Sequence, residues 1–177
     1  MINKHILYLF IMFSSLISYT QNKEDKWLNF GVELNTSLSY SGISTGAQVN
    51  LLHKKHSLGV GAKITYQNSY FPYQNALGIV IDYKYFLITK PNIKAFVAIN
   101  YNNTTYKLLS RDGNKSNIIH EYTYSNGILI KVFNNFWVGN SMGIGAYTEK
   151  YYDYSEAEYG SYLGYNVMFK AMMSYEF

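Results

Sequence analysis

The chain has 177 residues, enough for one domain, and a formal charge of +4 at neutral pH. It has no cysteine, which excludes a disulfide framework, an iron–sulfur cluster and a thiol nucleophile. The 20 tyrosines, 10 phenylalanines and only 2 prolines favour β-strands, because aromatic side chains suit a pleated, half-buried surface.

The first twenty residues, MINKHILYLFIMFSSLISYT, have the layout of a secretory signal peptide. Lys4 precedes an apolar stretch from Ile6 to Ile17, and small or polar residues follow it. This stretch is too short for a comfortable membrane-spanning helix, which makes an uncleaved anchor the weaker alternative. We expect cleavage before Gln21, giving a signal peptide at 1–20 and one mature domain at 21–177.

The rest of the sequence reads as alternating apolar and polar runs separated by turn signals, a pattern that predicts β-strands. Eight strands are expected, at 27–40, 43–53, 56–67, 76–88, 92–107, 118–132, 136–149 and 160–177. The connections after the first largely alternate between tight and longer, as in a barrel with short turns at one rim and longer loops at the other. A two-residue turn at Ser41-Gly42 would pair Leu38 with Thr45, and one at Lys54-Lys55 would pair Leu51 with Leu58.

The strands have two different faces. One face is apolar in every strand, for example at Leu34, Val60, Ile79, Ile99 and Val167. The other face carries ten of the thirteen glycines and the charges of the strand cores, which are Glu33, Lys63, Asp82, Lys84, Lys94, Glu121, Lys131, Lys170 and Glu176. Chance would scatter glycines and charges over both faces, so this segregation indicates two different environments.

The apolar face is expected on the outside, because a charge on the lipid face of a membrane barrel costs ~2–4 kcal/mol at mid-depth. Aromatic residues at the strand ends would form the two interfacial girdles. We assign Tyr40, Tyr66, Tyr101, Tyr122, Tyr147 and Tyr165 to the long-loop rim, and Trp27, Phe30, Tyr85, Phe136, Tyr175 and Phe177 to the other rim. The predicted fold is all-β, an eight-stranded antiparallel up-and-down transmembrane β-barrel. The alternative is a soluble, lipocalin-like carrier with its faces reversed.

The signal peptide, the eight alternating strands and the final YEF resemble the small outer-membrane β-barrels of Gram-negative bacteria, of the OmpA/OmpX-like kind in the porin family. The resemblance implies an outer-membrane location in contact with its lipids. It also implies that Tyr175 and Phe177 form the C-terminal signal read by the barrel-assembly machinery. The implied role is structural or surface interaction without enzymatic activity. The alternative on the same scaffold is a lipid-modifying enzyme.

The inward charges are expected to form ion pairs, because buried charges need partners. The spacing predicts that Lys63 lies opposite Asp82 and that Glu33 and Lys170 lie at similar heights across the closing seam. A filled, closed core is the preferred interpretation, since eight strands leave little room, and a very narrow pore is the alternative. Lysines that face the lumen could not reach a nucleic acid, so nucleic-acid binding is not expected.

No catalytic, cofactor or metal site is predicted. His53 and His56 flank two lysines without a third ligand nearby, which is typical of solvated turn residues. The glycines of SLGVGAK and GNSMGIGAY lack the strand-to-helix context of a phosphate loop. His120 faces outward near the long-loop rim, but Ser125 would point inward, so no His-Ser pair forms.

Two polar residues, Asn126 and Asn140, interrupt the apolar face on neighbouring strands. We expect them to be close, either satisfying each other or forming a polar patch for a partner or a lipid headgroup. The segment 149–160 is rich in tyrosine and acidic residues. It is either a recognition tip for an extracellular partner or an extended hairpin, and the sequence leaves both open.

Overall fold

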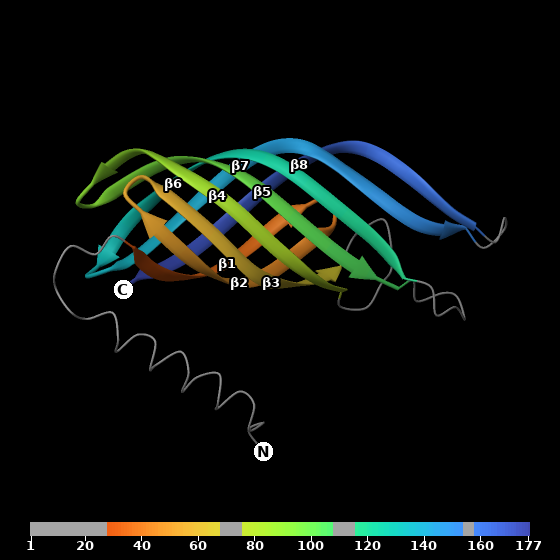
Figure 1. Ribbon diagram of the computed structural model, residues 1–177, viewed down its shortest axis with the longest axis horizontal. Helices are drawn as coiled ribbons and strands as arrows, with labels where there is room; N and C mark the ends of the chain where they lie inside the picture. The colour runs from red at the N-terminus through yellow and green to blue at the C-terminus, as the bar shows by residue number, and fades with distance from the viewer. Residues whose placement is uncertain (1–27, 68–75, 108–115, 154–157) are drawn as a thin grey trace, which may run out of the picture.

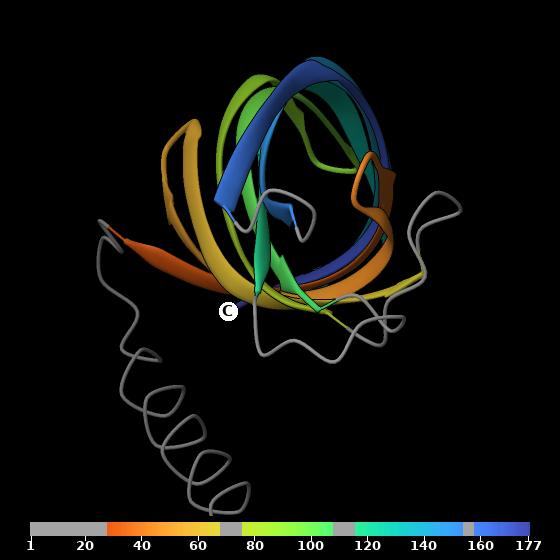
Figure 2. The ribbon, with the colours of Figure 1, turned by 90° about the vertical axis from the view of Figure 1, so that its right-hand side faces the viewer.

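The computed structural model describes residues 28–67, 76–107, 116–153 and 158–177, which form one antiparallel sheet (Figure 1). The strands are β1 Asn29–Ser39, β2 Gly42–His53, β3 His56–Gln67, β4 Ala76–Lys90, β5 Ile93–Tyr106, β6 Asn117–Phe133, β7 Phe136–Asp153 and β8 Glu158–Glu176. Each strand pairs with the next and β8 pairs with β1, so that the sheet closes into a ring (Figure 2). In the described part of the chain, no segment is a helix of the length and apolarity that a membrane span requires.

The predicted fold class is confirmed, and all eight strands lie within a few residues of their predicted positions. The main difference is the hairpin of β7 and β8, which pairs as far as Asp153 and Glu158 and is longer than predicted. Of the two possibilities for 149–160, the described part is therefore an extended hairpin, which projects beyond the end of β1 (Figure 1). The predicted cleavage site, Trp27 and Glu156 lie outside the described residues.

The two faces of the sheet are oriented as predicted. Outward apolar side chains such as Ile99 and Ile144 are well exposed, the latter by 69%. Inward carboxylates such as Glu33 and Asp82 are 1% and 0% exposed. Because the apolar side chains face outward and the charges are buried, the barrel is a transmembrane barrel and not a carrier with its apolar face inside.

The tight connection between β1 and β2 differs from the prediction by one residue. The turn is Tyr40-Ser41, and Gly42 begins β2 with a φ of 111°, a backbone conformation that favours glycine. Leu38 therefore pairs with Ile43 and not with Thr45. The register shift is two residues, so every side chain keeps its predicted face. The predicted pairing of Leu51 with Leu58 is confirmed.

The predicted opposition of Lys63 and Asp82 is wrong. Lys63 pairs with Gly78, and Asp82 pairs with Gly59. A side chain at Gly59 would collide with the Asp82 carboxylate, and one at Gly78 would crowd the Lys63 stem at 3.1 Å. The register thus places both of these charged side chains beside glycines, which is how a narrow interior accommodates them.

Candidate functional site

The middle of the barrel holds a cluster of four charged side chains, here called the central cluster: Glu33 on β1, Asp82 and Lys84 on β4, and Lys170 on β8. The Lys170 ammonium lies 2.7 Å from an Asp82 oxygen and 3.2 Å from a Glu33 oxygen. Lys84 pairs with Glu33 and lies 3.7 Å from Asp82. Gln48 donates from its amide to both Asp82 oxygens, at 3.0 and 3.1 Å. Two cations and two anions cancel, so the cluster carries no net charge.

A second ion pair joins Lys63 on β3 to Glu121 on β6, with 3.4 Å between the ammonium and a carboxylate oxygen. The turn between β1 and β2 reaches this pair across the barrel. The Ser41 amide and hydroxyl donate to the two Glu121 oxygens at 3.2 and 3.0 Å. Ser41 and Glu121 are both fully buried. The turn is therefore folded into the barrel and fixed to the opposite wall.

Above this pair, the same turn contributes to an aromatic layer at the long-loop end. The Tyr40 ring stacks on Tyr147 with ring centroids 3.4 Å apart. The Tyr40 hydroxyl donates to Glu149 at 3.0 Å, and Tyr106 donates to the same carboxylate. Burial raises the pKa of the Tyr40 hydroxyl above its ordinary value, and contacts with Tyr147 and Glu149 raise it further, so this group stays protonated and donates. Ala76 and Ile119 complete the layer.

The inward positions of Tyr40 and Tyr147 correct their predicted places in the lipid-facing girdle. Tyr147 is 5% exposed and pairs with Gly164 on β8. A side chain at Gly164 would collide with the Tyr147 ring, so the glycine provides the room that the ring occupies. Strict alternation from Gly143 and Gly145 could have placed Tyr147 inside.

The short-turn end of the interior is also apolar, which the sequence reasoning missed. The buried cluster there consists of Phe86, Phe96, Ala98, Leu129, Trp137 and Met172. Lys94 lies 4.2 Å from the Trp137 ring and pairs with the Glu176 carboxylate at 2.6 Å. Lys131 lies 5.8 Å from the same ring. The signal was present, because Phe86 shares its face of β4 with Asp82 and Lys84.

The interior is therefore layered, with a central charged zone between an aromatic layer and an apolar layer. Counting Glu149, which lies inside and not in a loop, the described inward charges are five lysines and five carboxylates. They are Lys63, Lys84, Lys94, Lys131, Lys170, Glu33, Asp82, Glu121, Glu149 and Glu176. Ion pairs that are buried in this way hold one another in place, since removing one partner leaves an uncompensated buried charge.

Two of the histidines contact tyrosines, and His120 and Ser125 lie on opposite faces of the sheet. His120 Nδ1 lies 2.9 Å from the Tyr101 hydroxyl and 3.3 Å from the Asn103 amide nitrogen, both within hydrogen-bond distance. Ser125 lies on the opposite face, fully buried, and contacts the Asn100 amide at 2.8 Å. His56 contacts the Tyr83 hydroxyl at 2.6 Å beside its turn. No group of three His, Asp or Glu side chains there is arranged to hold a metal ion.

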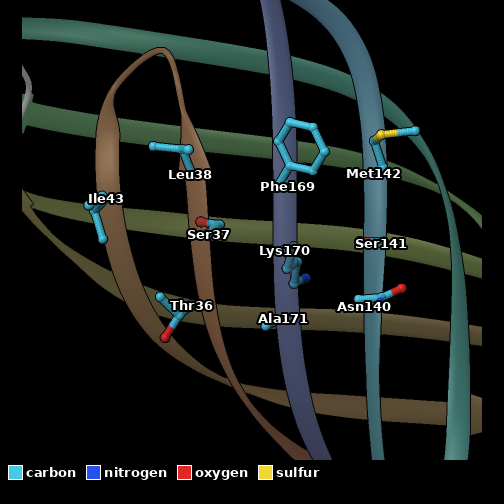
Figure 3. A pocket seen from close by; sticks show the side chains of 10 residues that line it. All are labelled: Thr36, Ser37, Leu38, Ile43, Asn140, Ser141, Met142, Phe169, Lys170 and Ala171. Atoms are coloured by element: carbon cyan, nitrogen blue, oxygen red, sulfur yellow. The ribbon is translucent and has the colours of Figure 1, made fainter.

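Asn126 and Asn140 both face outward but are diagonal neighbours, since Asn126 pairs with Met142 and Asn140 with Ile128. Among the described residues, no hydrogen bond joins their two amides. Asn140 lines a pocket of about 670 Å³ together with Thr36, Leu38, Met142, Phe169 and Ala171 (Figure 3). A role of the two asparagines in partner or lipid contact stays a prediction.

No protein-family model matches the sequence, and neither does any curated protein. Among solved structures, the chain is similar to the N-terminal β-barrel domain of Pseudomonas aeruginosa OprF, with 11% identity, a TM-score of 0.60 and coverage of 84% of this chain and 97% of that one. Neisserial surface protein A has 13% identity, a TM-score of 0.46 and coverage of 85% and 96%. A major outer membrane protein of Thermus thermophilus has 13% identity, a TM-score of 0.45 and coverage of 85% and 99%. The fold of the chain is that of the eight-stranded outer-membrane β-barrels.

Proposed function

We propose that this protein is a structural barrel of the outer membrane whose lumen does not conduct ions. The observation that carries the proposal is the filled interior. The Tyr40–Tyr147 stack and the Phe86–Phe96–Trp137 cluster lie at opposite ends of neutral clusters of paired charges. A lumen of eight strands is only just wide enough for side chains, so we infer that these layers close it to water and ions.

The turn between β1 and β2 also fills the lumen, although it is a connection between strands and not part of the barrel wall. Its anchoring by Glu121 and Glu149 supports a stably closed state. A conducting pore would need an uninterrupted polar lining, whereas Tyr147 and Phe96 are buried inside.

Surface contact is the second element of the proposed role. The hairpin of β7 and β8 extends past the shorter β1, and its described part exposes Tyr159 and Tyr162. Exposed tyrosines combine apolar area with a polar group, and they are enriched where proteins recognise partners. An extracellular partner that binds this hairpin fits the arrangement.

The C-terminal strand is proposed to carry the signal for assembly in the membrane. β8 closes the barrel against β1, and the Phe177 amide donates to the Phe30 carbonyl at 2.8 Å. The rings of Tyr175 and Phe177 contact each other edge to face, with centroids 4.9 Å apart. The barrel-assembly machinery would bind β8 first, and β1 would then take the place of the machinery beside β8 when the barrel closes.

Current through single barrels in a planar bilayer tests the closed lumen. We expect the native protein to stay at the closed baseline, and Lys63→Met to do the same because the aromatic and apolar layers remain. Tyr147→Ala should give brief openings, since it removes half of the aromatic stack, whereas Tyr122→Ala on the outer face should not. Insertion is checked by the shift in gel mobility on heating. Steady stepwise conductance of the native protein would contradict the proposal.

A further inference from the structure

The outer surface of the barrel has a lipid-contacting band whose limits can be placed from its tyrosines. On β8, Tyr175 and Tyr165 both face outward and lie ten residues apart. With a rise of about 3.3 Å per residue and a tilt of roughly 35–45°, this separation corresponds to about 25 Å along the barrel axis. That is the height of the apolar band between aromatic girdles in such barrels. Outward residues beyond the upper tyrosines therefore lie at the level of the lipid headgroups.

On β5, β6 and β7, the residues at this level are polar. Asn103, His120 and Thr148 are neighbours in one row across the three strands. This row lies one outward position beyond Tyr101 and Tyr122, which are themselves paired. Below the tyrosines the same strands present Ile99, Tyr124 and Ile144 to the lipid. The change from apolar to polar side chains occurs at the position where the bilayer changes from hydrocarbon to headgroups.

His120 is held by its neighbours in a defined orientation and tautomer. The Asn103 amide and the Tyr101 hydroxyl both reach Nδ1, and the Asn103 amide nitrogen can only donate. Nδ1 is therefore the acceptor, and the proton of the neutral ring is on Nε2. The ring is also stacked on Tyr101 with an interplanar angle of 19°. Within the described residues Nε2 makes no hydrogen bond, so it is a fixed donor that remains available.

The charge around His120 has one sign. Lys150 is the diagonal neighbour of His120, since it pairs with Ile118 while Thr148 pairs with His120. Diagonal neighbours of this kind are about 7–8 Å apart, within reach of a lysine side chain. In the structure the Lys150 ammonium lies over the Tyr159 ring of β8 at 5.2 Å, so the side chain turns toward β6 when it contacts a headgroup beside His120. The nearby carboxylates Glu121 and Glu149 are buried inside the barrel, and Asp153 and Glu158 lie further along the hairpin, with Asp153 on the same face of β7 as Glu149.

We propose that His120, Thr148 and Lys150 bind the phosphate group of an anionic lipid headgroup, in the membrane leaflet at the long-loop end, with Asn103 holding the His120 ring in place. The Lys150 ammonium supplies the charge, and His120 Nε2 and the Thr148 hydroxyl supply hydrogen bonds. The acyl chains of that lipid lie along the apolar face below Tyr122 and Ile144. Basic groups at headgroup level attract anionic lipids by about 1 kcal/mol each, so the loss of Lys150 should weaken binding about fivefold.

The test uses the full-length barrel labelled with ¹⁵N-histidine, in non-ionic detergent. It is titrated with dipalmitoyl phosphatidic acid, with dipalmitoyl phosphatidylcholine or with inorganic phosphate. The chain has only 4 histidines, so His120→Gln assigns the His120 resonance by its loss. Two matched variants are compared. Lys150→Gln removes a lysine at the site, and Lys90→Gln removes an exposed lysine at the opposite rim, so both variants change the net charge by the same amount.

We expect phosphatidic acid to shift the His120 Nε2 resonance in a saturable manner, and phosphatidylcholine to shift it much less. Lys150→Gln should raise the apparent dissociation constant about fivefold, and Lys90→Gln should leave it near the native value. An unmoved Nε2 resonance, or equal weakening by the two lysine variants, would overturn the site. An equal shift by inorganic phosphate at the same concentration would overturn its assignment to a lipid.

Discussion

At the scale of single residues, alternation along the strands predicted which charges lie inside, but not which of them would be partners. Glu33 and Lys170 form an ion pair as expected, with 3.2 Å between the charged atoms. In the strand register, however, the residue of β1 directly opposite Lys170 is Ser37. The partner of Lys63 is Glu121, three strands away around the ring. Such contacts cross the lumen and depend on side-chain reach and on every register between the two strands. A single sequence does not reveal them.

The central cluster makes a prediction about stability. Glu33→Gln should lower the free energy of unfolding by about 3–5 kcal/mol, because Lys84 and Lys170 would then share only Asp82 in a buried site. Glu176→Gln makes the same chemical change in a more exposed pair with Lys94, so it should cost about 1 kcal/mol or less. Urea unfolding in lipid vesicles measures both. Equal losses for the two variants would contradict the assignment of a buried cluster, and Glu33→Gln/Lys84→Gln should recover part of the loss.

At the scale of the elements, the strands were predictable because period-2 alternation persists through each of them. The turn of β1 and β2 was misplaced by one residue, because the Ser-Gly signal is local, whereas the turn is fixed by distant Glu121 and Asn166. The extended β7–β8 hairpin was left undecided for a related reason. Its tyrosines suit a strand or a recognition loop equally well.

The closing strand makes a prediction about assembly. In cells, Phe177→Ala should lower the amount of folded, heat-modifiable barrel severalfold, because the proposed terminal signal is weakened. Phe169→Ala removes the same ring from the middle of the outer face of β8 and should have a smaller effect.

Refolding of the same two variants into pure lipid vesicles separates recognition from intrinsic stability. There the Phe177→Ala protein should fold about as well as the Phe169→Ala protein, since no assembly machinery is present. If Phe177→Ala assembles in cells as well as Phe169→Ala does, the terminal phenylalanine is an ordinary interfacial residue.

At the scale of the whole molecule, the distribution of side chains over the two faces determines the architecture. Glycines and charges share the inner face, where the glycines make room for Tyr147, Lys63 and the other large side chains. The outer face presents isoleucine, leucine, valine and tyrosine. The sequence predicted this segregation, but not the apolar layer around Phe96 and Trp137, because aromatic residues occur on both faces of the strands and their type alone does not mark the inner one.

The most direct test of the account is the environment of the outer face in lipid vesicles. The chain has no cysteine, so single spin labels can be placed at Ile144→Cys, within the lipid band, and at Leu163→Cys, beyond it on β8. We expect oxygen, which partitions into hydrocarbon, to relax the label at residue 144, and a water-soluble nickel chelate to relax the label at residue 163. Strong relaxation of the label at residue 144 by the nickel chelate would show that water and not lipid covers the apolar face, which would contradict the account.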